Sequence, residues 1–180
     1  MGVEGEFARI GRRLFAEHLV GGNFGNMSLR SDDHGFFITQ TGSFLDDPGE
    51  AIFVPREGEA PTGASSEWRV HRSIYAKTHH LAIVHAHPPH AVAASLMLDE
   101  IIPQDSEGKM FCPVIPIAEG EPGTQNLADS VAHCLVSSPL CIARGHGTFA
   151  GGKTLQEGYL MTSLAEHACR VIALTKQYHA

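Results

Sequence analysis

The sequence predicts a three-layer α/β/α domain, in which helices cover both faces of a central sheet. Segments with helical spacing of apolar residues alternate along the chain with short apolar segments that suit strands. One of these, residues 80–87, has no polar residue except histidine, which is typical of a strand buried on both faces. A chain of 180 residues fits one domain, and we place that domain over residues 1–180.

The first part of the chain predicts two helices with three strands between them. Residues 3–19 form an amphipathic helix, which the glycine-rich segment 21–26 ends. The predicted strands cover residues 27–30, 35–39 and 51–55, and a turn joins the first two as a hairpin. A second helix is predicted over residues 66–77, with Ser65 or Ser66 as its N-cap.

The remainder of the chain predicts three strands and three helices. The strands cover residues 80–87, 113–117 and 140–144. The helices cover residues 88–98, 127–136 and 154–178, and the first of them opens with prolines, which a first helical turn tolerates. No apolar run approaches the roughly 18 residues that a membrane-spanning helix needs.

Composition narrows the classes of partner. The net charge of −7 provides no basic field for nucleic acid or for acidic membranes. An anionic metabolite must therefore be bound locally, by backbone N–H groups, hydroxyls or a metal ion. The four cysteines contain no CxxC pair, which argues against a disulfide framework or a cysteine zinc site. The first residues do not resemble a signal peptide, so the cytoplasm is the expected location.

Histidines at the ends of two apolar segments indicate a metal site. His85 and His87 are two residues apart on a predicted strand, so their imidazoles project to the same side. A catalytic zinc site needs about three protein ligands and an open position. The best third candidate is His146, which lies between glycines after the strand at residues 140–144. A parallel neighbouring strand would bring it beside His87. The alternative, in which these are hydrogen-bonded core histidines, stays open at this point.

Short polar residues on predicted loops are candidates for binding an anion. They form three pairs, called the polar pairs below: Gly25–Asn26, Thr41–Gly42 and Ser65–Ser66. Each pair offers N–H or O–H donors that suit a phosphate group. Glu67 follows the last pair at a predicted helix start, where a carboxylate also favours the helix dipole. Spacing alone does not bring these residues together.

Five segments in order resemble the class II aldolase/adducin family over nearly the whole chain. They are "GNFGNMSLR", "FFITQTGSF", "ASSEWRVHRSIY", "AIVHAHPPHAVAAS" and "ARGHGTFAGG". The resemblance implies a three-layer α/β/α sandwich whose central sheet is mixed and largely antiparallel. It also implies a homotetramer with active sites at the interfaces between subunits.

The resemblance further implies roles for particular residues. His85, His87 and His146 would bind one divalent ion, usually Zn²⁺, with manganese or cobalt as other choices. The polar pairs would hold the substrate's phosphate, and Glu67 would act as the catalytic acid/base. The implied reaction cleaves a phosphorylated ketose, such as L-fuculose 1-phosphate, to dihydroxyacetone phosphate and an aldehyde such as lactaldehyde.

The chain departs from the aldolases of this family at the aldehyde end. Those aldolases have a tyrosine near the place where this chain has Glu107, and a second tyrosine in a C-terminal tail, where this chain has only Tyr178. Glu107 is therefore a possible second acid. It keeps open a dehydratase acting on methylthioribulose 1-phosphate, while Glu67 favours the aldolase over that dehydratase and over a pentulose-phosphate 4-epimerase. A non-catalytic, adducin-like interaction module is a further alternative.

Overall fold

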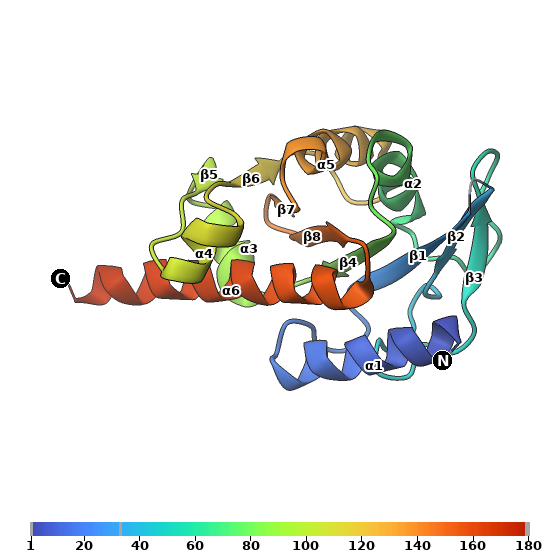
Figure 1. The fold of residues 1–180 in the computed structure, drawn as a ribbon, viewed down its shortest axis with the longest axis horizontal. Coiled ribbons are helices and arrows are strands. Elements are labelled where there is room, and N and C mark those ends of the chain that lie inside the picture. Colours follow the sequence, from blue (N-terminus) through green and yellow to red (C-terminus); the bar gives the residue numbers. More distant parts are fainter. Residues whose placement is uncertain (1, 33, 179–180) are drawn as a thin grey trace.

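Within residues 2–32 and 34–178, which the computed structural model describes, eight strands form one sheet with helices on both faces (Figure 1). In chain order the elements are α1 (Val3–Ala16), β1 (Asn26–Asp32), β2 (Gly35–Ile38), β3 (Ile52–Pro55), α2 (Trp68–Lys77), β4 (Ala82–Ala86), α3 (Pro89–Ser95), β5 (Glu100–Ile101), α4 (Ser106–Phe111), β6 (Ile115–Ala118), α5 (Gln125–Ser137), β7 (Leu140–Ala143), β8 (Gly147–Gly152) and α6 (Leu155–Gln177). The predicted three-layer α/β/α fold is confirmed.

The sheet is mixed and largely antiparallel, also as expected. Its strand order is β3-β2-β1-β4-β8-β7-β6-β5, and among these neighbours only β6 and β7 run parallel. The predicted hairpin is present as β1 and β2, although its turn includes Asp33, which lies outside the described residues. Strand β4 lies in the middle of the sheet and all its residues are buried, which confirms the prediction from its apolar sequence.

Helices α2 and α5 cover one face of the sheet, and α1, α3 and α6 cover the other (Figure 1). Alternate residues of β4 point to opposite faces, so Ile83 packs into the core beneath α2 and α5. Val84 packs on the other side, against α1 and α6. His85 shares the face of Ile83, and the metal-site candidates therefore lie on the side of α2 and α5.

Helix α6 buries one side between Leu155 and Ile172. Tyr159, Ala165 and Cys169 are among the residues it buries against the sheet and α3, whereas Glu157 and Lys176 lie near its two ends. Its polar face is exposed, and within the described part of the chain no helix combines the length and apolar character that crossing a bilayer requires.

The expected arrangement of the two histidine-bearing strands was wrong. Strand β7 is not a neighbour of β4, because β8 lies between them and pairs antiparallel with both. The segment that forms β8, "GTFAGG", was not predicted as a strand, since glycine and alanine are poor strand formers and mark loops in sequence. His146 lies in the turn that joins β7 to β8, and this turn brings it to the end of β4.

Three smaller differences concern two short elements and the ends of two helices. Strand β5 and helix α4 were not predicted, although Asp105 caps α4 by accepting a hydrogen bond from the N–H of Gly108 at 2.7 Å. Helix α1 ends at Ala16 and not at residue 19. His18 has a positive φ of 57°, which does not fit a right-handed helix. The N-cap of α2 is Glu67, so neither predicted serine holds that position.

Candidate active site

Three histidine side chains converge at the end of β4. His85 is on β4, His87 follows it directly, and His146 comes from the turn between β7 and β8. One ring nitrogen from each lies within 4.8 Å of the others. The Nε2 atoms of His85 and His87 are 3.0 Å apart. The structure thus brings together the residues that the sequence suggested as ligands, and a single ion can contact all of them.

His85 is the most rigidly held of the three. Its Nδ1 lies 2.8 Å from the carbonyl oxygen of Thr148 on β8, to which it donates a hydrogen bond. Phe149 stacks on its ring with the centroids 4.0 Å apart. The proton on Nδ1 leaves Nε2 with a free lone pair, and hydrogen bonding of the second ring nitrogen in this way is usual for metal ligands.

His146 is positioned by a tight turn. The pair Ala143–Gly147 closes the β7/β8 hairpin, and the N–H of His146 donates to the carbonyl of Ala143 at 3.0 Å. Gly145 has φ +65°, in the left-handed region that glycine adopts without a steric penalty. The Nδ1 atom of His146 is buried and has no hydrogen-bond partner among the described residues. Such a nitrogen beside two other imidazoles fits a metal-binding role.

The environment keeps all three rings neutral. Burial and then the neighbouring histidines lower the pKa of His85 well below its ordinary value. Burial and then His146 lower the pKa of His87 to about 4, and burial lowers that of His146. Neutral imidazole is the form that binds a metal, so the donor set fits a divalent ion without first losing protons.

Glu67 is a buried carboxyl group at the start of α2. It is 5% exposed, and its Oε1 accepts a hydrogen bond from the N–H of Gly123 at 3.1 Å. Its Oε2 is buried and has no partner within the described residues. Burial raises the pKa of Glu67, and the Gly123 N–H offsets this only in part. A carboxyl group in this state is suited to exchange protons.

The polar pairs meet through hydrogen bonds centred on Thr39. The N–H of Thr39 donates to the carbonyl of Met27, the residue after Asn26, and the N–H of Ser65 donates to the carbonyl of Thr39 at 3.2 Å. Thr41 is tied in turn to Gly63 by a backbone hydrogen bond of 2.9 Å. The loops that carry the three pairs are therefore joined to one another and to the start of β1.

The first polar pair also lies beside the histidines. Asn26 is directly opposite His85 in the β1/β4 ladder, which places their Cβ atoms roughly 5 Å apart. Gly25 has φ +78°, and a Cβ at that position would lie 2.6 Å from the carbonyl oxygen of His85. Only glycine lets the backbone approach the metal-site strand so closely.

A cavity of about 550 Å³ opens beside His146 and contains side chains that the sequence did not single out. Glu119, Glu121 and Asn126 line it, and Arg144 holds Glu119 by a 2.6 Å ion pair. In the sequence, the feature that marks Glu119 and Glu121 is the Gly/Pro segment "EGEPG" after β6. Such segments are too common in loops to identify a site.

Two residues considered for the aldehyde end lie elsewhere on the surface. Glu107 is exposed in the first turn of α4 and does not line the cavity beside His146. Tyr178 is 88% exposed just after α6. Their roles stay predictions.

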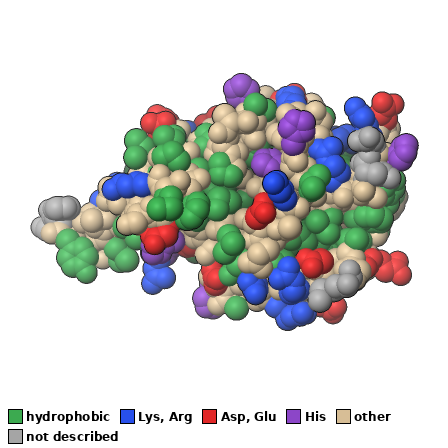
Figure 2. Space-filling view, viewed as in Figure 1, with side chains coloured by type: hydrophobic (Ala, Val, Ile, Leu, Met, Phe, Trp, Pro, Cys, Tyr) green, Lys and Arg blue, Asp and Glu red, His purple; other side chains and the backbone are tan. Residues whose placement is uncertain are grey.

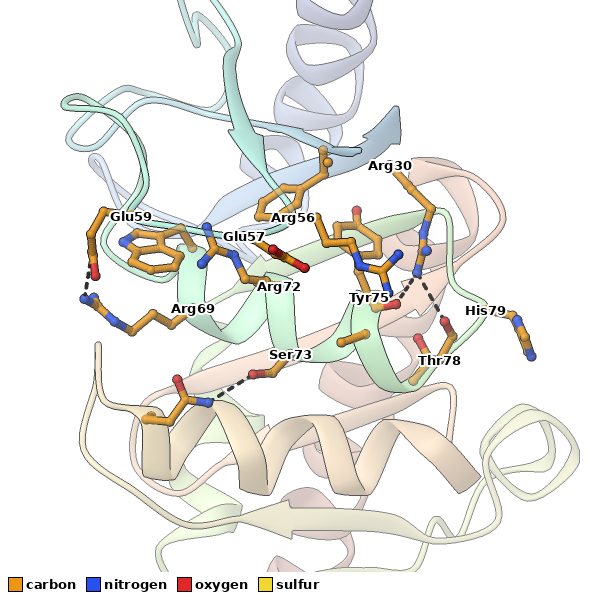
Figure 3. Close-up of a pocket in the computed structure, with 15 residues that line it drawn as sticks. Arg30, Arg56, Glu57, Glu59, Arg69, Arg72, Ser73, Tyr75, Thr78 and His79 are labelled. Carbon is orange, nitrogen blue, oxygen red and sulfur yellow. Dashed lines mark hydrogen bonds and ion pairs between the residues drawn. The ribbon is translucent and has the colours of Figure 1, made fainter. Parts of the chain in front are cut away.

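A second cavity, of about 660 Å³, lies along the outer side of α2 (Figure 3). Its arginines mainly brace that helix. Arg30 donates to the carbonyls of Tyr75 and Thr78 at the end of α2, and Arg72 donates to the carbonyl of Pro55 at 2.9 Å. Arg69 pairs with Glu59 at 3.5 Å. The side chains around this cavity thus hold α2, the helix that follows Glu67, in place.

His71 should make the folded state sensitive to acid. It is fully buried on α2, and burial lowers its pKa to about 3, against roughly 6.5 in an unfolded chain. The stabilising contribution of the neutral ring is complete above pH 6.5 and is lost as pH falls, at about 1.4 kcal/mol per unit down to pH 3. Urea unfolding at several pH values should give a steeper loss for the wild type than for the non-titrating His71→Gln variant. Parallel curves would contradict this assignment.

The sequence is similar to a known protein family and to enzymes that act on sugar phosphates. The sequence profile described as "Class II Aldolase and Adducin N-terminal domain" matches residues 5–173. The L-fuculose phosphate aldolase of Methanococcus vannielii is 30% identical over 171 residues, covering 92% of this chain and 93% of the relative. A 5-methylthioribulose-1-phosphate/5-deoxyribulose-1-phosphate aldolase of Rhodospirillum rubrum is also 30% identical over 171 residues, covering 87% of this chain and 71% of that protein.

Solved structures agree on the fold. The crystal structure of L-fuculose-1-phosphate aldolase from Thermus thermophilus superimposes with a TM-score of 0.93 at 34% identity, covering 98% of this chain and 95% of that one. The profile match extends over nearly the whole chain and includes the three histidines, Glu67 and the polar pairs. This chain belongs to the class II aldolase/adducin family.

Proposed function

We propose that the chain is a zinc-dependent aldehyde-lyase that reversibly cleaves a phosphorylated ketose, such as L-fuculose 1-phosphate. The products would be dihydroxyacetone phosphate and an aldehyde such as lactaldehyde. One observation carries the proposal: three neutral imidazoles have their ligand nitrogens within 4.8 Å of one another at the end of β4, and β4 pairs with β1 next to the first polar pair. The named relatives support the class of substrate, since each acts on a sugar phosphate.

His85, His87 and His146 would hold the ion, which when bound supplies Lewis-acid stabilisation of the negative charge that develops on the three-carbon fragment. The chain supplies the other requirements. The polar pairs bind and orient the phosphate through backbone N–H groups and hydroxyls, and this remote binding lowers the barrier at the reacting carbon. Phe149, stacked on His85, keeps one side of the site dry.

Glu67 would transfer the proton that the reaction requires. In the cleavage direction its carboxylate accepts the proton of the hydroxyl that becomes the aldehyde oxygen, and its carboxyl form then returns a proton to the three-carbon fragment. The raised pKa of Glu67 makes its protonated form easier to reach, which the second of these roles requires. The Gly123 N–H fixes one carboxyl oxygen and leaves Oε2 for the substrate.

The decisive assay uses zinc-loaded protein with dihydroxyacetone phosphate and a panel of aldehydes, with products identified by mass. The expected product is a ketose 1-phosphate whose mass equals the sum of the two reactants. Zinc-free protein, prepared with a chelator, should form none. Failure to form an adduct with any aldehyde would contradict the aldolase proposal, and failure to bind any divalent ion would favour the adducin-like module.

The dehydratase alternative is tested in parallel with methylthioribulose 1-phosphate. An aldolase divides this ketose into dihydroxyacetone phosphate and an aldehyde, whereas a dehydratase gives one product lighter by a water molecule. A 4-epimerase would leave the mass of a pentulose phosphate unchanged. Glu107→Gln should change aldol cleavage by less than about threefold, because its side chain is exposed on α4. A large fall in dehydration would instead support Glu107 as an acid.

A homotetramer with active sites at its subunit interfaces is part of the proposal. Apolar side chains are exposed along the segment from the end of α3 to the start of β6: Leu96, Met97, Ile102, Met110, Phe111 and Val114. Figure 2 shows hydrophobic side chains gathered over the part of the molecule that carries α4. Exposed apolar groups in this number suit a protein interface. Leu96 also lines the cavity beside His146, so a subunit packed here would approach the site.

A further inference from the structure

Asn26 is fixed by a histidine that the reaction described above does not use. His71 on α2 has no exposed surface, and its imidazole bridges two residues of β1. Its Nε2 lies 2.6 Å from Oδ1 of Asn26, and its Nδ1 lies 2.6 Å from Oγ of Ser28. Asn26 and Ser28 are two residues apart on a strand, so both side chains face α2 and one ring contacts both.

The chain of hydrogen bonds continues from Ser28 to Tyr75. Tyr75 determines which group in the chain donates and which accepts. The Tyr75 hydroxyl lies 2.7 Å from Oγ of Ser28, the only side-chain partner found for it in the described chain. Burial raises the pKa of Tyr75, so the phenol stays protonated. Its O–H therefore donates a hydrogen bond to Oγ of Ser28. Arg30 holds Tyr75 in place, with its guanidinium 4.8 Å from the ring centroid and a hydrogen bond to the Tyr75 carbonyl (Figure 3).

The direction of this chain determines which nitrogen of His71 carries the proton. Ser28 accepts from Tyr75 and therefore donates its own hydrogen to Nδ1 of His71. Because burial keeps the ring neutral, the single ring proton is on Nε2, which donates to Oδ1 of Asn26. The reverse direction would leave the buried Tyr75 proton without an acceptor, at a cost in stability.

This arrangement holds the Asn26 carboxamide by its oxygen and leaves its NH₂ group available. Within the described residues no hydrogen bond from that NH₂ group is found, and Asn26 is 5% exposed beside Gly25 and His85. A carboxamide turned by half a revolution would present its oxygen to the same space, and an oxygen acceptor repels a phosphate oxygen.

We propose that His71 is a positioning residue for the substrate phosphate: the relay Tyr75–Ser28–His71 holds the Asn26 carboxamide by its oxygen, so that its N–H donors stay available to that phosphate. The inference rests on the proposed function, which assigns those pairs to the phosphate. It adds a residue that does not touch the substrate but decides whether Asn26 attracts or repels it.

The test compares His71→Phe, which keeps the ring shape without a donor, with His71→Gln, whose amide nitrogen replaces Nε2. In zinc-loaded protein, His71→Phe should weaken binding of inorganic phosphate and of dihydroxyacetone phosphate by about 10- to 100-fold, as expected for a lost hydrogen bond to a charged group. Binding of unphosphorylated dihydroxyacetone should change less than about twofold. His71→Gln should recover most of the phosphate affinity, and His133→Gln, at an exposed histidine, should match the wild type.

Three results would overturn the inference. One is phosphate affinity in folded His71→Phe equal to that of the wild type, and another is equal weakening for dihydroxyacetone and its phosphate. The third does not depend on a variant that folds: ¹⁵N NMR of wild-type His71 must report the neutral tautomer with the proton on Nε2, and the Nδ1–H tautomer would contradict the relay. Wild-type protein that does not bind inorganic phosphate would contradict the proposed function as well.

Discussion

Replacing His146 by alanine should reduce turnover by about three decades or more and lower the zinc content of the purified protein. The loss corresponds to the several kcal/mol by which a bound ion stabilises developing charge. His146 lies in the β7/β8 turn, half-buried, and its Nδ1 has no hydrogen-bond partner among the described residues. Its removal therefore takes away a ligand without breaking a hydrogen bond of Nδ1.

The measurement pairs metal analysis with steady-state rates at saturating zinc. His167→Ala is a matched control, since His167 is an exposed histidine on α6 and should keep both zinc and activity. Circular dichroism and the unfolding temperature check that the His146 variant is folded. Full zinc content together with full activity in His146→Ala would remove His146 from the ligand set and leave the site with only His85 and His87.

Glu67→Gln should lower turnover by roughly two to four decades while zinc content and the affinity for dihydroxyacetone phosphate stay close to wild type. Glutamine has nearly the same shape, and its oxygen can still accept the hydrogen bond from Gly123. What it loses is the ability to exchange a proton. Because the buried Oε2 has no partner in the described chain, an amide nitrogen at its place breaks no hydrogen bond.

Glu57→Gln is the control for a carboxylate removed from the loop before α2, because Glu57 is exposed. Rates should be measured in both directions of the aldol reaction, since one residue that moves the proton affects both equally. Turnover within a few-fold of wild type in folded Glu67→Gln would assign the acid/base role elsewhere, and Glu119 or Glu121 in the cavity beside His146 would be the next candidates.

Local sequence patterns predicted the parts of this fold that local interactions determine. The apolar run around His85 identified a buried central strand, and the spacing of His85 and His87 placed two imidazoles on one side. The position of His146 between glycines after a second buried strand also indicated it as the third ligand, whereas only the resemblance to a family supplied the expectation that Glu67 belongs with them. The structure then placed His146 beside the other two histidines.

What sequence could not predict depends on contacts between distant segments. Strand β8 is formed by residues with poor strand propensity, and its pairing with β4 and β7 overrides that propensity. The meeting of the polar pairs depends on backbone hydrogen bonds through Thr39, which leave no trace in side-chain patterns. His71 resembles any buried helical residue in sequence, and only its two short contacts with β1 reveal its connection to Asn26.

The pairing of Asn26 with His85 has a consequence for how this molecule can diversify. Under the proposed function, the distance between the metal ion and the substrate phosphate is set by one residue pair of the β1/β4 ladder. Sliding β1 by one residue would turn Asn26 to the opposite face. An insertion in β1 would separate Asn26 from His85, whereas Glu119 to Pro122 form a loop between β6 and α5 that lines the cavity beside His146. Under the proposed function, we therefore expect changes of substrate to come from this loop and not from β1.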